Sequence, residues 1–393
     1  MTHLKTRKAP GRALGWALKK PLRSLALLLS TTLPLGKPTM AQQTIYLGTY
    51  TGPQSQGIYR SALDEATGQL SAPELVAQAK NPSFLALSPD GRALYAALEA
   101  DGTVGAWAIA KDGKLSALNQ QPSGGDGACH VWVDATGKNV LVANYNSGSI
   151  ACFRVRQDGS VGERNAFVQF TGSGPDANRQ QGPHAHSVYT NASNTLVYSC
   201  DLGTDQVHIF RFDSAQGTLL PNDPPSGKVP PGSGPRHLVL GRRGFAYANN
   251  EMGLSVTAFK IDPATGALTE IQTIPTVPQD APRAGVSTAE IFAHPSGKWL
   301  YVSNRGRDTI TVYAITQDGK LSLVEETPTP QEPRGFAISA DGKWLVVGGQ
   351  KDNRVQAFRI DAATGKLKAS GQPVEVGSPV CVLFAPHAAA DVK

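Results

Sequence analysis

The strongest constraint on the fold is a short phrase that returns seven times along the chain. Each copy has alternating apolar residues, then a turn of the form Asp-x-x-Thr-Gly or x-Asp-Gly, then Leu or Val. The copies are Gly57–Leu70, Val104–Leu115, Ile150–Val161, Val207–Leu219, Val256–Leu268, Ile310–Leu321 and Val355–Leu367. Starts at 104, 150, 207, 256, 310 and 355 give spacings of 46, 57, 49, 54 and 45 residues. Such spacings are typical of propeller blades, which must stack to bury their apolar faces.

A second phrase precedes six of these copies and completes the repeating unit. It consists of a strand, a turn such as Pro-Asp-Gly or Ala-Thr-Gly, and another strand. The copies are Leu85–Leu98, Val131–Asn144, Val188–Cys200, Leu238–Asn249, Ile291–Asn304 and Phe336–Gly349. Glycine permits the positive φ of tight hairpins, and the flanking Leu, Val, Tyr and Trp favour pleated surfaces. Each module is therefore predicted to contain four antiparallel strands.

The missing seventh copy of the second phrase is divided between the two ends of the repeat region. Pro379–Pro386 (PVCVLFAP) is similar to Pro82–Pro89 (PSFLALSP), and Thr44–Tyr50 (TIYLGTY) is similar to the strand that should follow. Pairing these segments would close the ring and remove exposed sheet edges. We therefore predict an all-β, seven-bladed β-propeller closed by its N- and C-terminal strands. A pair of β-sandwiches, the alternative, predicts no repeat of this period.

Length alone would favour two or three domains, but no linker interrupts the repeats. The longest irregular stretches, 172–183 and 221–235, are rich in Gly, Pro, Asp and Asn. We interpret both as loops over a face of the ring. The cysteines, Cys129, Cys152, Cys200 and Cys381, have unrelated spacings and include no CxxC pair, so we expect buried, unpaired thiols.

The first 41 residues differ in composition from the repeats. Residues 1–37 carry eight basic side chains and no acidic one, an apolar run follows at 25–35, and the segment ends Thr39-Met40-Ala41. This pattern is typical of a secretory signal peptide. A membrane anchor is the weaker alternative because the run is too short to span a bilayer. We predict a signal peptide at 1–41, a propeller domain at 42–393, and a periplasmic or secreted protein.

Removal of that leader changes the charge of the protein. The chain has 37 basic and 31 acidic side chains, and subtracting the eight basic residues leaves 29 against 31. A mature net charge of about −2 gives no reason to expect nucleic-acid binding. We expect neither a nucleic-acid partner nor a membrane association after cleavage, and the sequence leaves the oligomeric state open.

Charged and polar residues gather where the inner strand of each blade should begin and where the second strand should end. Two strands joined by one hairpin return the chain to its starting face, so these positions share one opening. They include His186, Arg236, His237, Glu251, Glu290, Arg305, Arg334 and Gln350. Long charged side chains are rarely buried without partners, so their convergence indicates a polar ligand site. Solvated loop residues or ion pairs between blades are the alternative interpretation.

Several phrases resemble one family in order along the chain. They are GPHAHSV (182–188) with DLGTDQV (201–207), GPRH (234–237) with NNEMGLSV (249–256), AEI (289–291) with SNRGRDTITVY (303–313), and PRGFAIS (333–339) with GGQKDNRV (348–355). From about residue 44 to 386 the chain resembles the lactonase family of seven-bladed propellers. That family includes bacterial 6-phosphogluconolactonases and is similar to fungal carboxymuconate lactonising enzymes.

The resemblance implies a lactone hydrolase and assigns roles to the polar residues. The family's catalytic His, Arg, Glu and Arg fall on His186, Arg236, Glu251 and Arg305. A neutral histidine can take a proton from water, so His186 is the expected base, with Glu251 holding its tautomer or sharing the proton transfer. The two arginines would stabilise the oxyanion and grip an anionic group. The residues expected to bind substrate are His184, His237, Glu290, Arg334 and Gln350.

Alternatives remain open at this stage. His184 and His186, two apart on a strand, could bind a divalent metal with Glu251 or Glu290, although we expect no metal and no cofactor. A Ser/His/Asp mechanism has no support, because the chain has no Gly-x-Ser-x-Gly motif. The same ring could also be a non-catalytic binding propeller or a carboxymuconate-type enzyme. An exported enzyme would meet lactones other than phosphorylated cytoplasmic metabolites.

Overall fold

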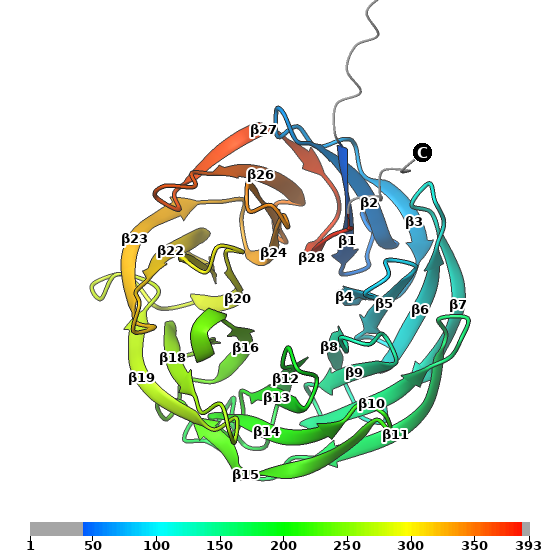
Figure 1. The fold of residues 1–393 in the computed structure, drawn as a ribbon. Helices are drawn as coiled ribbons and strands as arrows, with labels where there is room; N and C mark the ends of the chain where they lie inside the picture. The colour runs from blue at the N-terminus through cyan, green and yellow to red at the C-terminus, as the bar shows by residue number, and fades with distance from the viewer. Residues whose placement is uncertain (1–41, 387–393) are drawn as a thin grey trace, which may run out of the picture. The chain divides into compact units, whose positions relative to one another are not determined.

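The computed structural model describes residues 42–386, and these form seven four-stranded antiparallel sheets arranged around a central axis (Figure 1). This architecture confirms the predicted seven-bladed propeller. The expected signal peptide lies outside the described residues. Within residues 42–386, no helix is long and apolar enough to cross a membrane.

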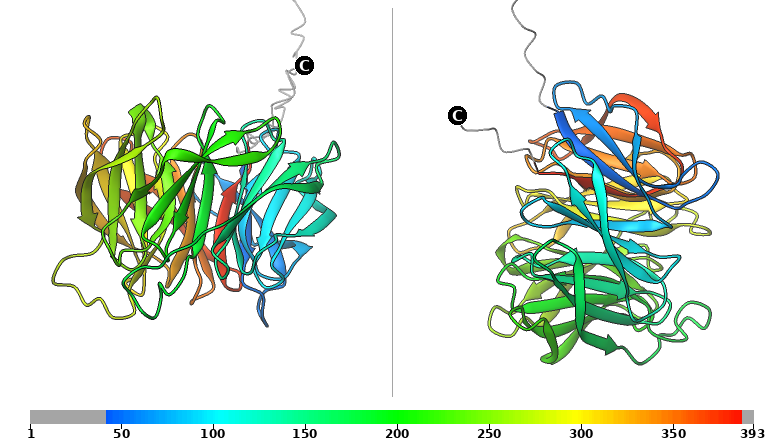
Figure 2. Two further views of the ribbon diagram at one scale, coloured as in Figure 1. Left: turned by 90° about the horizontal axis from the view of Figure 1, so that it is seen from below. Right: turned by 90° about the vertical axis from the view of Figure 1, so that its right-hand side faces the viewer.

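Each blade begins with a strand beside the central axis and continues outward. The innermost strands are β4 (Pro82–Leu87), β8 (Ala128–Val133), β12 (Ala185–Thr190), β16 (Pro235–Leu240), β20 (Ser287–Ala293), β24 (Pro333–Ile338) and β28 (Pro379–Phe384). The second strands are β1 (Gln42–Thr49), β5 (Ala93–Leu98), β9 (Asn139–Asn144), β13 (Leu196–Asp201), β17 (Phe245–Asn250), β21 (Trp299–Arg305) and β25 (Trp344–Gly349). Seen from the side, the inner strands run between the two faces of the ring (Figure 2).

The two outer strands of each blade correspond to the sevenfold phrase. The third strands are β2 (Gly57–Asp64), β6 (Thr103–Ile109), β10 (Ser149–Val155), β14 (Gln206–Asp213), β18 (Ser255–Ile261), β22 (Thr309–Ile315) and β26 (Arg354–Ile360). The fourth strands are β3 (Glu74–Gln78), β7 (Leu115–Pro122), β11 (Val161–Gln169), β15 (Thr218–Lys228), β19 (Leu268–Pro275), β23 (Leu321–Pro328) and β27 (Leu367–Glu375). The intervening turns end in glycine at positive φ, as at Gly319 (φ 82°) and Gly365 (φ 73°), a conformation that other residues rarely adopt.

The ring closes as predicted, by strands from opposite ends of the chain. β28 pairs antiparallel with β1, with Phe384 opposite Ile45 and Val382 opposite Leu47. The blade β28-β1-β2-β3 is therefore built from both termini. Apolar side chains of neighbouring blades fill the space between the sheets, and one such cluster includes Leu47, Val346 and Val382.

One expected loop is a strand instead. Residues 218–228 form β15, which pairs with β14, so the interpretation of 221–235 as a continuous loop was wrong for its first half. β15 is the outer edge of its blade, where prolines are tolerated because the outward N–H groups need no partner. Residues 172–183 do form a loop as expected. All four cysteines are free and buried, which confirms the prediction of unpaired thiols.

The hairpin between β16 and β17 is closed by a short 3-10 turn, Arg242–Gly244. Arg243 lies there at φ 62°, in the conformation that glycine supplies in other blades. This turn lies at the opposite face of the ring from the beginning of β16, so it leaves the polar residues at that beginning undisturbed.

Candidate active site

The polar residues meet at the face where the inner strands begin and the second strands end, which we call the mouth. Six of the nine predicted site residues are connected there by direct contacts: His186 on β12, Arg236 and His237 on β16, Glu251 after β17, Glu290 on β20, and Arg305 at the end of β21. Each of these six is at most 8% exposed. Convergence from three blades therefore places charged groups inside the protein, which requires mutual pairing.

Glu251 is the centre of this pairing because three guanidinium groups contact its carboxylate. Its Oε2 accepts a hydrogen bond from Arg236 Nε at 3.1 Å and forms an ion pair with Arg305 Nη2 at 2.9 Å, while Oε1 accepts from Arg179 Nη2 at 2.8 Å. Burial opposes ionisation of Glu251, but Arg305, Arg236 and Arg179 outweigh it and lower its pKa to about 2. Glu251 is therefore an anion that holds three cations in place.

The two buried arginines have further fixed contacts on β20. Arg236 donates through Nη1 to the carbonyl oxygen of Ala289, and Arg305 Nη2 donates to Thr288 O at 3.1 Å. Burial, together with the nearby Arg334 and Arg305 charges, lowers the pKa of Arg236 to about 10, so it remains protonated at neutral pH. Both guanidinium groups are thus oriented before any ligand binds.

His237 and Glu290 form a separate pair at the centre of the ring. His237 Nδ1 lies 2.6 Å from Glu290 Oε1, and its Nε2 lies 3.2 Å from Arg236 Nη1. Arginine can only donate, so Nε2 is an acceptor and the proton of the neutral ring is on Nδ1, facing Glu290. Burial raises the pKa of Glu290 to about 8, and burial beside Arg236 holds that of His237 well below 6.5. The pair is therefore largely uncharged at neutral pH.

His186 is a neutral imidazole at the edge of this cluster. Its ring centroid lies 5.2 Å from that of His237 and 5.4 Å from that of Tyr145. Burial, with Arg236 and His237 nearby, lowers its pKa well below 6.5. Its Nδ1 is enclosed and has no hydrogen-bond partner within residues 42–386. A base of this kind is unprotonated at physiological pH.

The expected contact between Glu251 and His186 is not among the hydrogen bonds of the described residues. Both oxygens of Glu251 are occupied by arginines, and the carboxylate that meets a histidine is Glu290, which contacts His237. Three arginines that are far apart in the sequence contact the Glu251 carboxylate. Sequence spacing alone could not show which side chains would pair with Glu251.

The other three predicted site residues lie around this cluster. His184 stacks on Tyr145 with ring centroids 4.6 Å apart, and its Nδ1 is 2.9 Å from Tyr145 O. Arg334 lies over the Tyr50 ring at 5.2 Å. Gln350 follows β25 and its backbone N–H donates to Glu332 O, but within residues 42–386 no hydrogen bond joins its side chain to the cluster.

Two residues of the mouth received no role from sequence reasoning. Arg179 comes from the 172–183 loop, and its Nη2 also donates to Tyr145 Oη at 3.1 Å. Gln180 holds this loop in place, because its side-chain amide donates to Leu202 O and to Asp205 Oδ1. Tyr145 directly follows β9, whose end lies at the mouth. Arg179 sits in an irregular loop, where no periodic pattern indicates which way a side chain points.

His130 on β8 is fully buried at the centre of the ring. Its ring lies 4.1 Å from that of Phe84 and 5.4 Å from that of His237. Among the described side chains, no three of His, Cys, Asp or Glu come together closely enough to hold a metal ion.

The fold matches a known class of protein. Residues 44–384 match the family described as "Lactonase, 7-bladed beta-propeller", and the chain belongs to this family. It is 35% identical over 345 residues to a 6-phosphogluconolactonase of Bacillus subtilis, covering 86% of this chain and 97% of that protein.

Solved structures agree with the family assignment. A putative 6-phosphogluconolactonase of Bacteroides fragilis superposes with a TM-score of 0.83 at 36% identity, covering 89% of this chain and 99% of that one. A periplasmic gluconolactonase of Pseudomonas aeruginosa gives a TM-score of 0.82 at 30% identity, covering 88% and 100% respectively.

Proposed function

We propose that this protein hydrolyses the ring ester of a sugar-type lactone at the mouth. The observation that carries the proposal is a neutral, buried imidazole, His186, beside guanidinium groups that Glu251 holds in fixed positions. Hydrolysis needs a base for the attacking water and donors for the oxygen on which negative charge grows. The names of the relatives support the same reaction class.

In the proposed mechanism, His186 removes a proton from a water molecule that attacks the lactone carbonyl carbon. The carbonyl oxygen becomes an oxyanion, which N–H groups of Arg236 and Arg305 stabilise. The ring C–O bond then breaks, and the protonated His186 returns its proton to the leaving oxygen. Because Glu251 fixes both arginines beforehand, little reorganisation is needed as charge develops.

The charge of the mouth supports a substrate with an anionic group. The mouth contains four guanidinium groups and two carboxylates, which leaves an excess of two positive charges. The guanidinium groups belong to Arg179, Arg236, Arg305 and Arg334, and the carboxylates to Glu251 and Glu99. Arg179 has 44% of its side chain exposed, so it keeps donors available to a ligand. A carboxylate or phosphate on the sugar would suit this environment.

We also propose that residues 1–41 direct export and are removed after Ala41. The basic and apolar pattern of that segment supports this proposal, as does a periplasmic relative at 30% identity. The N-terminal sequence of protein recovered from a bacterial periplasm should then begin at Gln42. A substrate found outside the inner membrane need not be phosphorylated.

The experiment that tests the function is a panel of sugar lactones, with and without phosphate, assayed by proton release. We expect turnover of at least one lactone and a loss of about a hundredfold or more in kcat/KM for His186→Ala. His294→Ala is the control, because His294 contacts Gly342 at the opposite face and should retain activity. Unchanged turnover in His186→Ala would remove its role as base. Saturable lactone binding without hydrolysis would instead indicate a binding propeller.

A further inference from the structure

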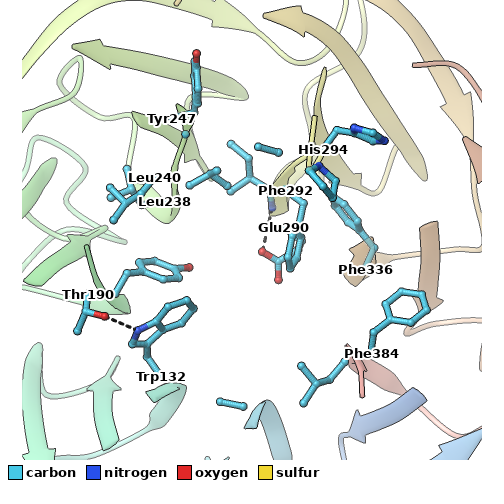
Figure 3. A pocket seen from close by; sticks show the side chains of 18 of the residues that line it. Trp132, Thr190, Leu238, Leu240, Tyr247, Glu290, Phe292, His294, Phe336 and Phe384 are labelled. Atoms are coloured by element: carbon cyan, nitrogen blue, oxygen red, sulfur yellow. Dashed lines mark hydrogen bonds between the residues drawn. The ribbon is translucent and has the colours of Figure 1, made fainter. Parts of the chain in front are cut away.

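A large hollow lies below the mouth and opens toward the opposite face of the ring. It measures about 760 Å³, and all seven inner strands contribute to its wall. We call it the lower channel. Its aromatic lining consists of Phe84, Trp132, Tyr189, Tyr247, Phe292, Phe336 and Phe384 (Figure 3). A cavity of this size and composition is typical of sites for small organic molecules.

The lower channel differs chemically from the mouth. Its wall is largely apolar. Apart from the buried Glu290, its acidic, basic and histidine side chains are Arg242, Arg243 and His294, which lie near the hairpin turns of the opposite face. The hydroxyl groups of a sugar would lose their water there without gaining partners, which is unfavourable. The proposed lactone site therefore does not extend into this space.

Glu290 places one polar atom at the closed end of the lower channel. Its Oε1 accepts from Ile291 N at 3.0 Å and from His237 Nδ1. Its Oε2 has no hydrogen-bond partner within residues 42–386, although the side chain is only 7% exposed. Figure 3 shows the carboxyl group directed into the cavity. A buried polar atom in this position favours a ligand that supplies one hydrogen-bonding group.

We propose that the lower channel is a second binding site, for a neutral aromatic molecule of the phenol class whose hydroxyl hydrogen-bonds to Glu290 Oε2. The aromatic wall would pack against the ring of the ligand, as aromatic side chains pack with each other. A phenol hydroxyl can donate or accept, so it can pair with either protonation state of this oxygen. The site is independent of the proposed lactone hydrolysis and is tested without that reaction.

The test is a fluorescence or calorimetric titration of the purified protein with 2-naphthol, with naphthalene as the ligand that lacks the hydroxyl. We expect one saturable site and an affinity for 2-naphthol about two- to tenfold higher than for naphthalene. Leu240→Trp fills the channel from β16 and should weaken binding at least tenfold. Leu220→Trp, on an exposed edge strand where Leu220 is 57% exposed, is the matched control and should bind normally.

A second pair of variants examines the polar contact. Glu290→Leu should abolish the preference for 2-naphthol over naphthalene. Glu290→Gln should retain this preference, because its amide places a polar atom where the carboxyl oxygen Oε2 lies in the native protein. Thermal melting of every variant checks folding, and Ala293→Leu is a smaller filling substitution if Leu240→Trp does not fold. Uptake without saturation, normal binding by every folded filling variant, or an unchanged preference in Glu290→Leu would overturn the proposal.

Discussion

Glu251 determines how the charges of the mouth are arranged. Three arginines from separate parts of the chain form ion pairs with its carboxylate, and two of them, Arg236 and Arg305, are almost completely buried. A buried guanidinium without a counterion would be strongly destabilising. One carboxylate therefore lets the ring carry excess positive charge at a single opening, where an anionic ligand can meet it.

Arg179 is the residue of this group best placed to recognise the substrate. Lysine at this position keeps the charge but cannot reach both Glu251 and Tyr145 with a planar fork. We expect Arg179→Lys to raise KM for an anionic lactone about fivefold, with a smaller change in kcat. Arg211→Lys, at an exposed position on β14, is the control. An equal rise in KM for uncharged lactones would show that Arg179 positions Tyr145 rather than recognising the anion.

Four buried groups give the stability of the protein a pH dependence. Burial lowers the pKa of His130, His186 and His237 well below 6.5 and raises that of Glu290 to about 8. Below about pH 6.5 the three histidines bind protons in the unfolded chain but stay neutral in the folded protein, so acid destabilises the fold. The contribution of the protonated Glu290 opposes this effect in part, because it is lost progressively as pH rises from about 4.5 to about 8.

Because three histidines outweigh one carboxyl, stability should fall from pH 6.5 toward pH 5. It should also decline from about pH 6.5 to pH 8, where the unfolded chain has lost the proton that Glu290 keeps in the folded state. Urea unfolding at pH 5, 6, 7 and 8 measures this profile. His130→Phe should flatten its acidic side, since it removes one of the three protonation sites. A free energy of unfolding that rises from pH 7 to pH 5 would contradict the proposed states of these groups.

At the scale of elements, the turns of the sevenfold phrase do more than reverse the chain. In five blades a tyrosine on the second strand donates to the carbonyl of the turn glycine in the next blade. The pairs are Tyr46–Gly113, Tyr95–Gly159, Tyr198–Gly266, Tyr247–Gly319 and Tyr301–Gly365. The repeat predicted each turn, but the partner lies one blade away and 64 to 72 residues along the chain. Only the stacking of blades brings it near.

Removal of one such hydrogen bond should have a measurable cost. Tyr247→Phe leaves the Gly319 carbonyl without its 3.0 Å partner inside the protein, and we expect a loss of about 1 kcal/mol in the free energy of unfolding. Tyr59→Phe is the comparison, because the Tyr59 hydroxyl accepts only from Gln56 N at an exposed position. Denaturant unfolding would contradict this role if the two substitutions had equal effects.

At the scale of the whole molecule, stability depends on closing the ring. β28 covers the edge of β1 and packs against β4 and β24, so its loss would expose two blades. A chain that stops at Glu375 should therefore aggregate or show no cooperative melting transition. The control is a circular permutant that joins Pro386 to Gln42 and opens in the exposed loop at 279–284, since it keeps every strand pair. A truncated chain that melts like the intact protein would contradict the closure argument.

The sequence by itself determined the architecture and the face on which the polar residues gather. Strand alternation and turn residues are local signals, and their repetition specified the number of blades and the closure by β28 and β1. Local patterns also placed His186, Arg236, Glu251 and Arg305 at one end of their strands. They failed at β15, because proline is excluded from central strands but not from an outer edge.

Only the tertiary structure decided which of these residues touch. It paired Glu251 with three arginines, joined Glu290 to His237, and brought Arg179 to the mouth from a loop without periodicity. It also enclosed the lower channel, whose wall needs all seven inner strands. The physical reason is that ion pairing and burial act over distances of a few ångströms in space. Residues on different blades reach those distances only after the ring has closed.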